Sequence, residues 1–399
     1  MQAVVIAAGQ GTRMMPLTDG TPKPLLPIGG TPIVERVLDV AAPHVDEFVV
    51  VVGYEGAQIK EHLGDEYRGR PLTYVTQSEQ LGTAHAIQQA EPHIEGPFLA
   101  LNGDVHITQA LVDALADEPK TAMAVMPVDD PTSYGVVDTQ RGTVTNIVEK
   151  PSDPPTNLAN LGLYRFSPTI FEYIDRTGLS ERGEYEITDS LQYAVDDGRP
   201  IAAVEYEGPW LDIGRPWELL TATEHLFKDL KRDVRGTVEP DATLRGPIVV
   251  EDGARVRNGA YVEGPVVIQA GADVGPNAYV RGGTVLGPDV RVGNAVEVKN
   301  SVLMADTAVG HLSYVGDSVL GRDVNFGAGT KVANLRHDDD PVRVQVKGEL
   351  TETGRRKFGV VVGHGTKTGI NTSLDAGVTL GTDSRTTPGE VVTRDKNRT

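Results

Sequence analysis

A period of six residues runs through the second half of the chain. Apolar side chains recur at this spacing in register, and glycine, asparagine, aspartate and proline fill many positions between them. A sustained hexapeptide period is typical of a parallel β-helix, in which each repeat supplies one short strand and one turn. The period is carried by Val238, Leu244, Val250, Val256, Val262, Ile268, Val274, Val280, Leu286, Val292 and Val298.

The same period continues beyond Val298 after a slip of one residue. The segment 335–358 interrupts it, and we interpret this segment as an inserted loop. A solenoid with flat faces can pack against copies of itself, so we expect a homo-oligomer. The later repeats are marked by Leu303, Val309, Val315, Leu320, Phe326, Val332, Val362, Leu374 and Leu380.

The first half of the chain has a different pattern, in which short apolar runs alternate with helical stretches. This alternation predicts βαβ units and a largely parallel sheet. We expect strands at 3–8, 47–53, 97–104 and 121–128, helices at 32–42 and 82–92, an antiparallel hairpin at 130–151 and a closing helix at 216–232. The predicted domains are therefore residues 1–230 and 231–399.

Composition limits the class of protein. The net charge of −19 argues against binding to nucleic acid, which needs basic patches. Cysteine is absent, so no disulfide framework is expected. The sequence has neither a signal-peptide pattern nor a long apolar run, which predicts a cytoplasmic protein that does not enter the membrane. The acidic balance fits either adaptation to high salt or an ordinary acidic protein.

The stretch "VVIAAGQGTRMMPLTDGTPKPLLPIGG" (4–30) follows the predicted first strand directly. Small residues in such a turn let main-chain N–H groups approach an anion closely. The loop lacks the third glycine of a dinucleotide fingerprint and the GKS/T of a P-loop, so by itself it also fits a plain strand-to-helix turn. Two nearby cations, Arg13 and Lys23, favour a triphosphate site. The small residues are Ala7, Ala8, Gly9 and Gly11.

Several motifs then follow in a fixed order: "QLGTAHA" (80–86), "NGDV" (102–105), "EKP" (149–151), "EYEITD" (184–189) and "WLDIGRP" (210–216). With the opening loop, the first half resembles the sugar-1-phosphate nucleotidyltransferases. Joined to a hexapeptide half, it is similar to the bifunctional N-acetylglucosamine-1-phosphate uridyltransferase / glucosamine-1-phosphate acetyltransferase family in its archaeal form. This resemblance implies an α/β fold: a Rossmann-like domain with a mixed, mainly parallel sheet, followed by a left-handed parallel β-helix that forms a homotrimer.

The resemblance also implies a first reaction, in which a sugar 1-phosphate attacks the α-phosphorus of UTP or dTTP and pyrophosphate leaves. Arg13 would hold the triphosphate, and Lys23 would bridge the α-phosphate and the incoming phosphate. Asp104 and Asp212 would hold Mg²⁺, which prefers oxygen ligands. The loop residues above with Thr12, Gln77, Gly82 and Thr83 would contact the nucleotide, and Gly135, Glu149 and Asn160 would contact the sugar.

A second reaction is implied by "VEVKNS" (296–301), "GHLSYVGD" (310–317) and "NFGAGT" (325–330). His311 would act as the general base for attack of the sugar amine on acetyl-CoA. Arg281 and Lys299 stand three hexapeptides apart, which predicts that they stack on neighbouring coils as a phosphate clamp. By the resemblance, Tyr314 and Asn334 would orient the sugar, and Asn325 and Ala328 would lie where the family binds substrate and CoA.

The sequence departs from the family after Asn334. The family usually supplies a lysine there, whereas this chain has Asp338, Asp339 and Asp340, with Arg343, Lys347 or "GRRK" (354–357) as possible substitutes. One alternative is therefore a glucose-1-phosphate uridylyl- or thymidylyltransferase whose β-helix is purely structural. Another is a non-catalytic subunit that binds nucleotide sugars.

Overall fold

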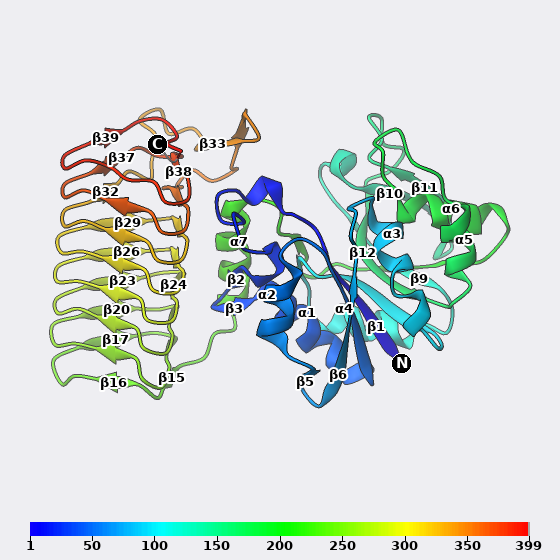
Figure 1. Cartoon of the computed structure of the whole chain (residues 1–399), viewed down its shortest axis with the longest axis horizontal. Coiled ribbons are helices and arrows are strands. Elements are labelled where there is room, and N and C mark those ends of the chain that lie inside the picture. The colour runs from blue at the N-terminus through cyan, green and yellow to red at the C-terminus, as the bar shows by residue number, and fades with distance from the viewer. Residues whose placement is uncertain (398–399) are drawn as a thin grey trace. The chain divides into compact units, whose positions relative to one another are not determined.

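A ten-stranded mixed sheet forms the centre of the first half of the chain (Figure 1). The computed structural model describes residues 1–397 and has two compact units, considered separately below. The first comprises Met1–Gln10, Pro22–Leu25 and Ile33–Asp212, and the second Gly11–Thr21, Leu26–Pro32 and the chain from Ile213 onward. The predicted domain division at residue 230 stays a prediction.

The order of strands in the sheet is β10-β11-β13-β9-β12-β7-β1-β4-β6-β5. Strands β7, β1, β4 and β6 are parallel neighbours, and β12 runs antiparallel between β7 and β9. The strands are β1 (Gln2–Ala7), β4 (Glu47–Val52), β5 (Glu66–Tyr67), β6 (Arg70–Thr76), β7 (Phe98–Asn102), β9 (Ala122–Pro127), β10 (Gly135–Gln140), β11 (Thr143–Glu149), β12 (Leu158–Phe166) and β13 (Ala202–Glu205). The predicted parallel strands and the antiparallel hairpin, β10–β11, are thus confirmed.

Helices cover both faces of this sheet, which explains why its strands read as continuous apolar runs. In β1, Val5 packs with the residues of α1 and α4, whereas Val4 packs with those of α3, α5 and α6. The predicted helix at 82–92 is shorter in the structure, because a separate 3-10 turn follows α3. The helices are α1 (Ile33–Ala41), α2 (Gly56–Leu63), α3 (Thr83–Gln88), α4 (Gln109–Asp117), α5 (Ile170–Arg176) and α6 (Ile187–Asp196).

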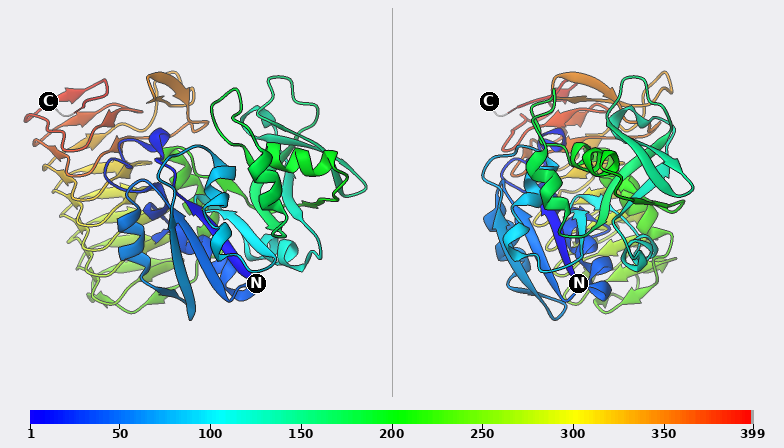
Figure 2. Two further views of the ribbon diagram at one scale, coloured as in Figure 1. Left: turned by 45° about the vertical axis from the view of Figure 1, so that its right-hand side comes forward. Right: turned by 90° about the vertical axis from the view of Figure 1, so that its right-hand side faces the viewer.

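Three parallel sheets form most of the second unit, and their coils stack one above another in the left-hand view of Figure 2. Partners in adjacent coils are 18 residues apart, as in Val256 opposite Val274. The spacing drops to 17 where Leu286 meets Leu303, which is the slip seen in the sequence. All residues of the six-residue period from Val250 on belong to one buried core, and Val238 and Leu244 pack against it. The predicted left-handed parallel β-helix is the architecture found.

Each sheet of the β-helix collects one side of every coil. The first contains β15 (Asp233–Val234), β18 (Ile248–Val250), β21 (Val266–Ile268), β24 (Thr284–Leu286), β27 (Val302–Leu303), β30 (Val319–Leu320), β35 (Val361–Val362) and β38 (Thr379–Leu380). The second contains β16 (Thr237–Val238), β19 (Arg255–Val256), β22 (Asp273–Val274), β25 (Arg291–Val292), β28 (Ala308–Val309), β31 (Asn325–Phe326) and β36 (Lys367–Thr368). The third contains β17 (Thr243–Arg245), β20 (Tyr261–Glu263), β23 (Tyr279–Arg281), β26 (Glu297–Lys299), β29 (Tyr314–Gly316), β32 (Lys331–Val332), β37 (Ser373–Leu374) and β39 (Val391–Val392).

Additional segments pack on the β-helix within the second unit. Helix α7 (Pro216–Phe227) ends five residues before the predicted end of the closing helix at 232. The predicted inserted loop at 335–358 is confirmed and contains a hairpin of β33 (Arg343–Val346) and β34 (Glu349–Glu352). Strands β2 (Pro27–Ile28) and β3 (Thr31–Pro32) pair with each other. No helix within residues 1–397 has the length and apolar character needed to span a bilayer.

Candidate functional site

Lys23 lies between two carboxylates of the first unit. It belongs to the short helix η2 (Lys23–Leu25) and is 5% exposed. Its Nζ lies 2.6 Å from Oδ2 of Asp104 and 3.8 Å from Oδ1 of Asp212. The two carboxylates meet because Asp104 follows β7 and precedes β8 (Val105–His106), which pairs with β14 (Leu211–Asp212). Each of these aspartate side chains is about one-third exposed.

This pair of carboxylates fits a hard divalent cation. Mg²⁺ takes oxygen ligands and is commonly bound by one or two carboxylates together with substrate phosphates. Lys23 contributes one positive charge and the two aspartates two negative charges, so the side chains alone carry a net charge of −1. A dication held by Asp104 and Asp212 would reverse that sign and favour a polyphosphate.

The glycine-containing loop leaves its main chain accessible. An added Cβ at Gly9 would meet no atom within 4 Å. Gly11 has φ of 63°, in the left-handed region that favours glycine. The carbonyl oxygen of Gly11 accepts hydrogen bonds from the Met14 N–H at 2.8 Å and the Thr18 hydroxyl at 3.0 Å. The loop therefore has an internally fixed turn beside an open stretch of backbone.

Arg13 is exposed in the second unit, on the short helix η1 (Thr12–Met14). Its guanidinium lies against Gly214, where an added Cβ would be 2.9 Å from Nη2. Arg13 also lines a cavity of about 360 Å³ together with Lys347, the residue at the tip of the inserted hairpin. Lys347 is thus a second cation on the wall of the cavity that Arg13 lines.

The predicted base-binding residues lie together after the carboxyl end of β6. Gln77 is 5% exposed, and its Nε2 donates to the Gly82 carbonyl at 3.1 Å and lies 3.0 Å from Nδ1 of His85. Gly82 has φ of 106°, and an added Cβ would lie only 2.6 Å from the Tyr185 carbonyl oxygen. Thr83 begins α3. Only glycine therefore fits position 82 without a shift of the neighbouring main chain.

The predicted sugar-binding residues also lie together. An added Cβ at Gly135 would lie 3.0 Å from Oε2 of Glu149 and 3.5 Å from Cβ of Asn160. Glu149 Oε2 accepts a hydrogen bond from the Thr188 hydroxyl at 3.1 Å. Asn160 donates to the buried Tyr164 hydroxyl at 2.7 Å. Backbone, carboxylate and amide thus converge on one side of the sheet, where they can meet sugar hydroxyls.

Two carboxylates near this group have raised pKa values. Burial, followed by the charge of Glu149, raises the pKa of Glu186 above its usual value. The same two causes raise the pKa of Asp189. Arg182 partly offsets this accumulation of negative charge through ion pairs to Glu149 at 3.4 Å and to Glu186 at 3.2 Å.

Arg281 and Lys299 are direct partners in adjacent coils, as their spacing predicts. Each cation has its own carboxylate: Arg281 pairs with Glu297 at 2.9 Å, and Lys299 pairs with Asp317 at 3.1 Å. Asn334 Nδ2 donates to the Tyr314 hydroxyl at 3.1 Å, which joins the two residues predicted to orient the sugar. Those carboxylates were not part of the predicted site.

His311, Asn325 and Ala328 occupy the turns and the strand that precede this face of the β-helix. His311 stands in the turn between β28 and β29 and is exposed, Asn325 is exposed in β31, and Ala328 lies in the turn after β31. Leu312, next to His311, is 61% exposed, and Ile370, in the turn between β36 and β37, is 54% exposed. Leu312 and Ile370 are thus apolar side chains in turns of the β-helix that this chain leaves exposed.

The acidic run in the inserted loop is largely neutralised by the loop itself. Arg336 forms an ion pair with Asp338, and Arg356 pairs with Asp339 at 2.6 Å. The hydrogen bond from Arg336 holds the pKa of Asp338 well below its usual range. Two of the three aspartates are thus already engaged by arginines of the same segment.

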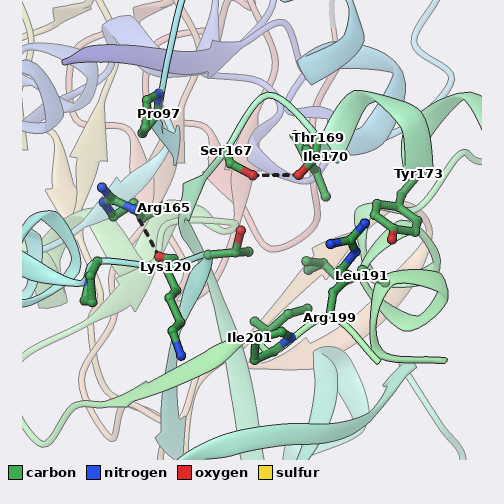
Figure 3. A pocket seen from close by; sticks show the side chains of 14 residues that line it. Pro97, Lys120, Arg165, Ser167, Thr169, Ile170, Tyr173, Leu191, Arg199 and Ile201 are labelled. Carbon is green, nitrogen blue, oxygen red and sulfur yellow. Dashed lines mark hydrogen bonds between the residues drawn. The ribbon is translucent and has the colours of Figure 1, made fainter. Parts of the chain in front are cut away.

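A further cavity of about 320 Å³ lies at the other ends of the sheet strands (Figure 3). It borders the residues just before β7, β9 and β13, whereas Asp104 follows the carboxyl end of β7. In Figure 3 the Arg165 guanidinium donates to the Lys120 carbonyl, and the Ser167 and Thr169 hydroxyls are bonded to each other. The predicted site residues do not line this cavity.

Sequence reasoning missed four residues that shape these sites: Gln80, Tyr185, Thr188 and Asp317. Gln80 donates at 2.9 Å to the carbonyl of Ala8, the buried residue that directly follows β1. All four stand inside motifs that carry the family resemblance, "QLGTAHA", "EYEITD" and "GHLSYVGD". Membership in these motifs could therefore have identified all four residues from the sequence.

Comparison with known proteins extends over both halves. Residues 2–229 match the family described as "Nucleotidyl transferase", and residues 262–364 match the "GMPPB C-terminal domain". A "Bifunctional protein GlmU" from Methanococcus aeolicus is 39% identical over 386 residues, covering 96% of this chain and 92% of that protein. A "Bifunctional sugar-1-phosphate nucleotidylyltransferase/acetyltransferase" from Sulfurisphaera tokodaii is 38% identical, covering 99% of this chain and 98% of its own.

Among solved structures, UDP-glucose pyrophosphorylase complexed with UDP-glucose aligns with a TM-score of 0.52 and 25% identity. The alignment covers 57% of this chain and 98% of that one. Because the sequence matches include relatives similar over nearly their whole length, this chain is an enzyme that belongs to the nucleotidyl transferase family and, within it, to the bifunctional sugar-1-phosphate nucleotidylyltransferase/acetyltransferases.

Proposed function

We propose that this enzyme transfers a nucleotidyl group from UTP or dTTP to a sugar 1-phosphate, releasing pyrophosphate, and that it acetylates glucosamine-1-phosphate with acetyl-CoA. The two reactions would serve the synthesis of UDP-N-acetylglucosamine in the cytoplasm. The observation that carries the proposal is the buried Lys23 ammonium between the partly exposed carboxylates of Asp104 and Asp212. Such an arrangement suits phosphoryl chemistry, in which catalysis is mostly positioning and charge neutralisation.

In the first reaction the residues hold phosphates rather than form bonds to them. The open backbone at Gly9 and the turn at Gly11 would cradle the triphosphate, and Arg13 would contact its outer phosphates. Lys23 would bind both the α-phosphate and the attacking phosphate oxygen. Mg²⁺, held by Asp104 and Asp212, would neutralise the charge of the phosphates.

The nucleotide base and the sugar would be recognised by the two clusters described above. The hydrogen bonds of Gln77 engage its amide nitrogen, so its amide oxygen would accept the N3–H of uracil or thymine. Glu149 and Asn160 would bind sugar hydroxyls, with Gly135 allowing the sugar to approach closely. This arrangement serves UTP and dTTP equally, since both bases carry the same N3–H.

In the second reaction His311 would act as the general base that removes a proton from the sugar amine as it attacks acetyl-CoA. Arg281 and Lys299 would hold the phosphate group of glucosamine-1-phosphate. Asn325 and Ala328 would contact substrate and CoA. The exposed Leu312 and Ile370 favour packing against further copies of the chain. We therefore propose a homotrimer, in which a neighbouring chain covers this edge.

A second candidate is a glucose-1-phosphate uridylyl- or thymidylyltransferase with a structural β-helix. It is favoured by the pairing of Arg281 and Lys299 with Glu297 and Asp317, which neutralises the proposed phosphate clamp. It is also favoured by the structural similarity to a UDP-glucose pyrophosphorylase. A purely binding protein is less well supported, because Lys23, Asp104 and Asp212 are all present and in contact.

A substrate matrix tests the proposal. Triphosphates are combined with sugar 1-phosphates, with and without Mg²⁺ and at low and molar KCl, while pyrophosphate and free CoA are measured separately. We expect pyrophosphate only with Mg²⁺ and with UTP or dTTP, and free CoA with glucosamine-1-phosphate in the wild type but not in His311→Ala. Equal CoA release by both proteins would instead support the structural β-helix.

A further inference from the structure

Asp317 is a buried carboxylate at a corner of the β-helix, between β29 and β30. It is 2% exposed and has φ of 51°. Its Oδ1 accepts a hydrogen bond from Asn300 Nδ2 at 2.9 Å. Its Oδ2 accepts from Lys299 Nζ at 3.1 Å and from Asn334 Nδ2 at 2.5 Å. Three donors from two other coils of the solenoid thus converge on one carboxylate.

This set of donors explains how a charge can remain at a buried position. An ionised carboxylate is stable away from water only when it is paired and hydrogen-bonded. The ammonium of Lys299 supplies the counter-charge, and the two asparagine amides supply the remaining hydrogen bonds. Lys299 Nζ contacts both oxygens of Asp317, at 3.1 and 3.5 Å, which leaves at least one of its three ammonium N–H groups for a phosphate.

A second layer of contacts holds this carboxylate from behind. Asn300 Nδ2 also donates to Oε1 of Glu224 on α7, at 3.0 Å. Glu224 in turn forms an ion pair with Arg355 of the inserted segment. Burial alone would raise the pKa of Glu224, but the hydrogen bond and charge of Arg355 outweigh it and lower the pKa. Arg355, Glu224, Asn300 and Asp317 therefore form a continuous polar chain within the second unit.

The same corner also fixes the two ends of the inserted segment. The Gly359 N–H donates to the Asp317 carbonyl at 2.8 Å, and the Phe358 N–H donates to the Asn334 carbonyl at 3.0 Å. Asn334 is the residue just before the insertion and also contacts the carboxylate of Asp317. The place where the chain leaves and re-enters the β-helix is therefore organised around Asp317.

We propose that Asp317 is a positioning residue for acetyl transfer, which fixes the Lys299 ammonium and the Asn334 amide where they receive the phosphate and the sugar of glucosamine-1-phosphate. Asn300, which also donates to Glu224, holds the other oxygen of the same carboxylate. This inference rests on the proposed acetyltransferase function and adds residues that act through Lys299 and Asn334 rather than on the substrate. It accounts for a buried charge that a purely structural corner would not need.

The test compares Asp317→Asn with Asp306→Asn. Asp306 occupies a solenoid turn with a similar φ of 61°, but it is exposed, so the two substitutions make the same chemical change in the same backbone conformation. We expect Asp317→Asn to raise the KM for glucosamine-1-phosphate by about tenfold or more, because a hydrogen bond to a charged group is lost. The KM for acetyl-CoA and the rate of nucleotidyl transfer stay unchanged, and Asp306→Asn behaves as wild type.

A double-mutant cycle separates positioning from general stability. Because Asp317 is proposed to act through both Lys299 and Asn334, adding Asp317→Asn to Lys299→Met should raise that KM less than Asp317→Asn does alone, whereas independent roles give additive effects. An unchanged KM in a folded Asp317→Asn protein, or additive effects in the cycle, would overturn the inference. Should Lys299→Met itself leave the KM unchanged, the proposed phosphate clamp fails and not the role of Asp317 alone.

Glu224→Gln covers the case in which Asp317→Asn does not fold. This substitution removes the negative charge of Glu224, which lies outside the Asp317 corner. It keeps a side-chain oxygen that can accept the hydrogen bond from Asn300. We expect a KM increase of about threefold for glucosamine-1-phosphate, with kcat retained. A wild-type KM in a folded Glu224→Gln protein would count against the polar chain, and so against the inference.

Discussion

The two proposed sites place positive charge by different structural means. In the first unit, Lys23, Asp104 and Asp212 come from segments far apart in sequence that the sheet and the β8–β14 pair bring together. In the β-helix, Arg281 and Lys299 meet because they occupy the same place in successive coils. In a repeat, the spacing of two residues alone predicts that their side chains are neighbours. In an open α/β fold, the same prediction requires knowledge of the whole strand topology.

The two sites also differ in their balance of charge. One buried cation faces two carboxylates in the first unit, whereas Arg281 and Lys299 each have one carboxylate partner, Glu297 and Asp317. The first site thus carries an excess negative charge that suits a dication and a polyphosphate. In the second site the charges of the two cations and the two carboxylates cancel before a substrate binds. A balanced site suits a sugar phosphate that must bind and then be released as part of the product.

The largest effect is expected from removing one active group in each site. Lys23→Met should lower nucleotidyl transfer by about a thousandfold, since the charge on the reacting phosphates loses its preorganised partner. His311→Asn should lower acetyl transfer by about a hundredfold or more, because the general base is lost. Pyrophosphate release and CoA release, measured on the same preparations, should be affected reciprocally.

Each variant is the control for the other. If Lys23→Met lowered both activities, or if His311→Asn lowered pyrophosphate release, the two reactions would not take place at separate sites. Unchanged pyrophosphate release in Lys23→Met would contradict the proposed role of Lys23 directly.

A smaller effect is expected at Gly82, where the base-binding loop approaches the main chain of Tyr185. Gly82→Ala would introduce both a strained φ of 106° and a Cβ only 2.6 Å from the Tyr185 carbonyl oxygen. We expect the KM for UTP to rise by about tenfold, with acetyl transfer unaffected.

Gly142→Ala is the matched control for that prediction. Gly142 also has a positive φ, of 74°, but an added Cβ there would meet no atom within 4 Å. Its effect should be limited to a small loss of stability, visible in the melting temperature and not in KM. A KM for UTP that is unchanged in both variants would contradict the expected effect of the close contact between position 82 and Tyr185.

Much of the fold was predictable because it is encoded locally. The six-residue period names the residues of the β-helix core, and even the slip at Leu303 appears as a shortened coil. The spacing of Arg281 and Lys299 correctly predicts that they are partners in adjacent coils. The bounds of α7 and α3 were less well predicted, because helix ends are set by local capping and turns.

The polar partners of the predicted residues could not be derived from the repeat. The apolar period predicts which residues face the core. It does not predict that a corner aspartate such as Asp317 is buried and accepts hydrogen bonds from three side chains. The same holds for the Glu224–Arg355 pair, which joins a helix to an insertion. Such contacts depend on side chains from unrelated segments, and the sequence carries no periodic signal for them.

The smallest predicted effect concerns how the Arg13 loop is fastened to the β-helix within the second unit. His364 Nδ1 accepts a hydrogen bond from the Arg322 N–H at 2.8 Å, so the neutral ring donates through Nε2 to the Leu17 carbonyl, also at 2.8 Å. Burial, outweighing the hydrogen bond to Leu17, lowers the pKa of His364 below 6.5. A proton on Nδ1 would remove the acceptor for Arg322.

The sign of the pH dependence follows from that lowered pKa. A histidine whose folded-state pKa is depressed contributes stability that is fully present above its unfolded pKa and is lost as the pH falls below it. Lowering the pH from about 7.5 to about 5.5 should therefore loosen the loop and raise the KM for UTP by about threefold. In His364→Ala the KM should be high at both pH values, with less dependence on pH, whereas His93→Ala, at an exposed histidine of the first unit, should follow the wild type. A wild-type pH profile in His364→Ala would show that His364 does not hold the loop bearing Arg13 and that another group sets the pH dependence.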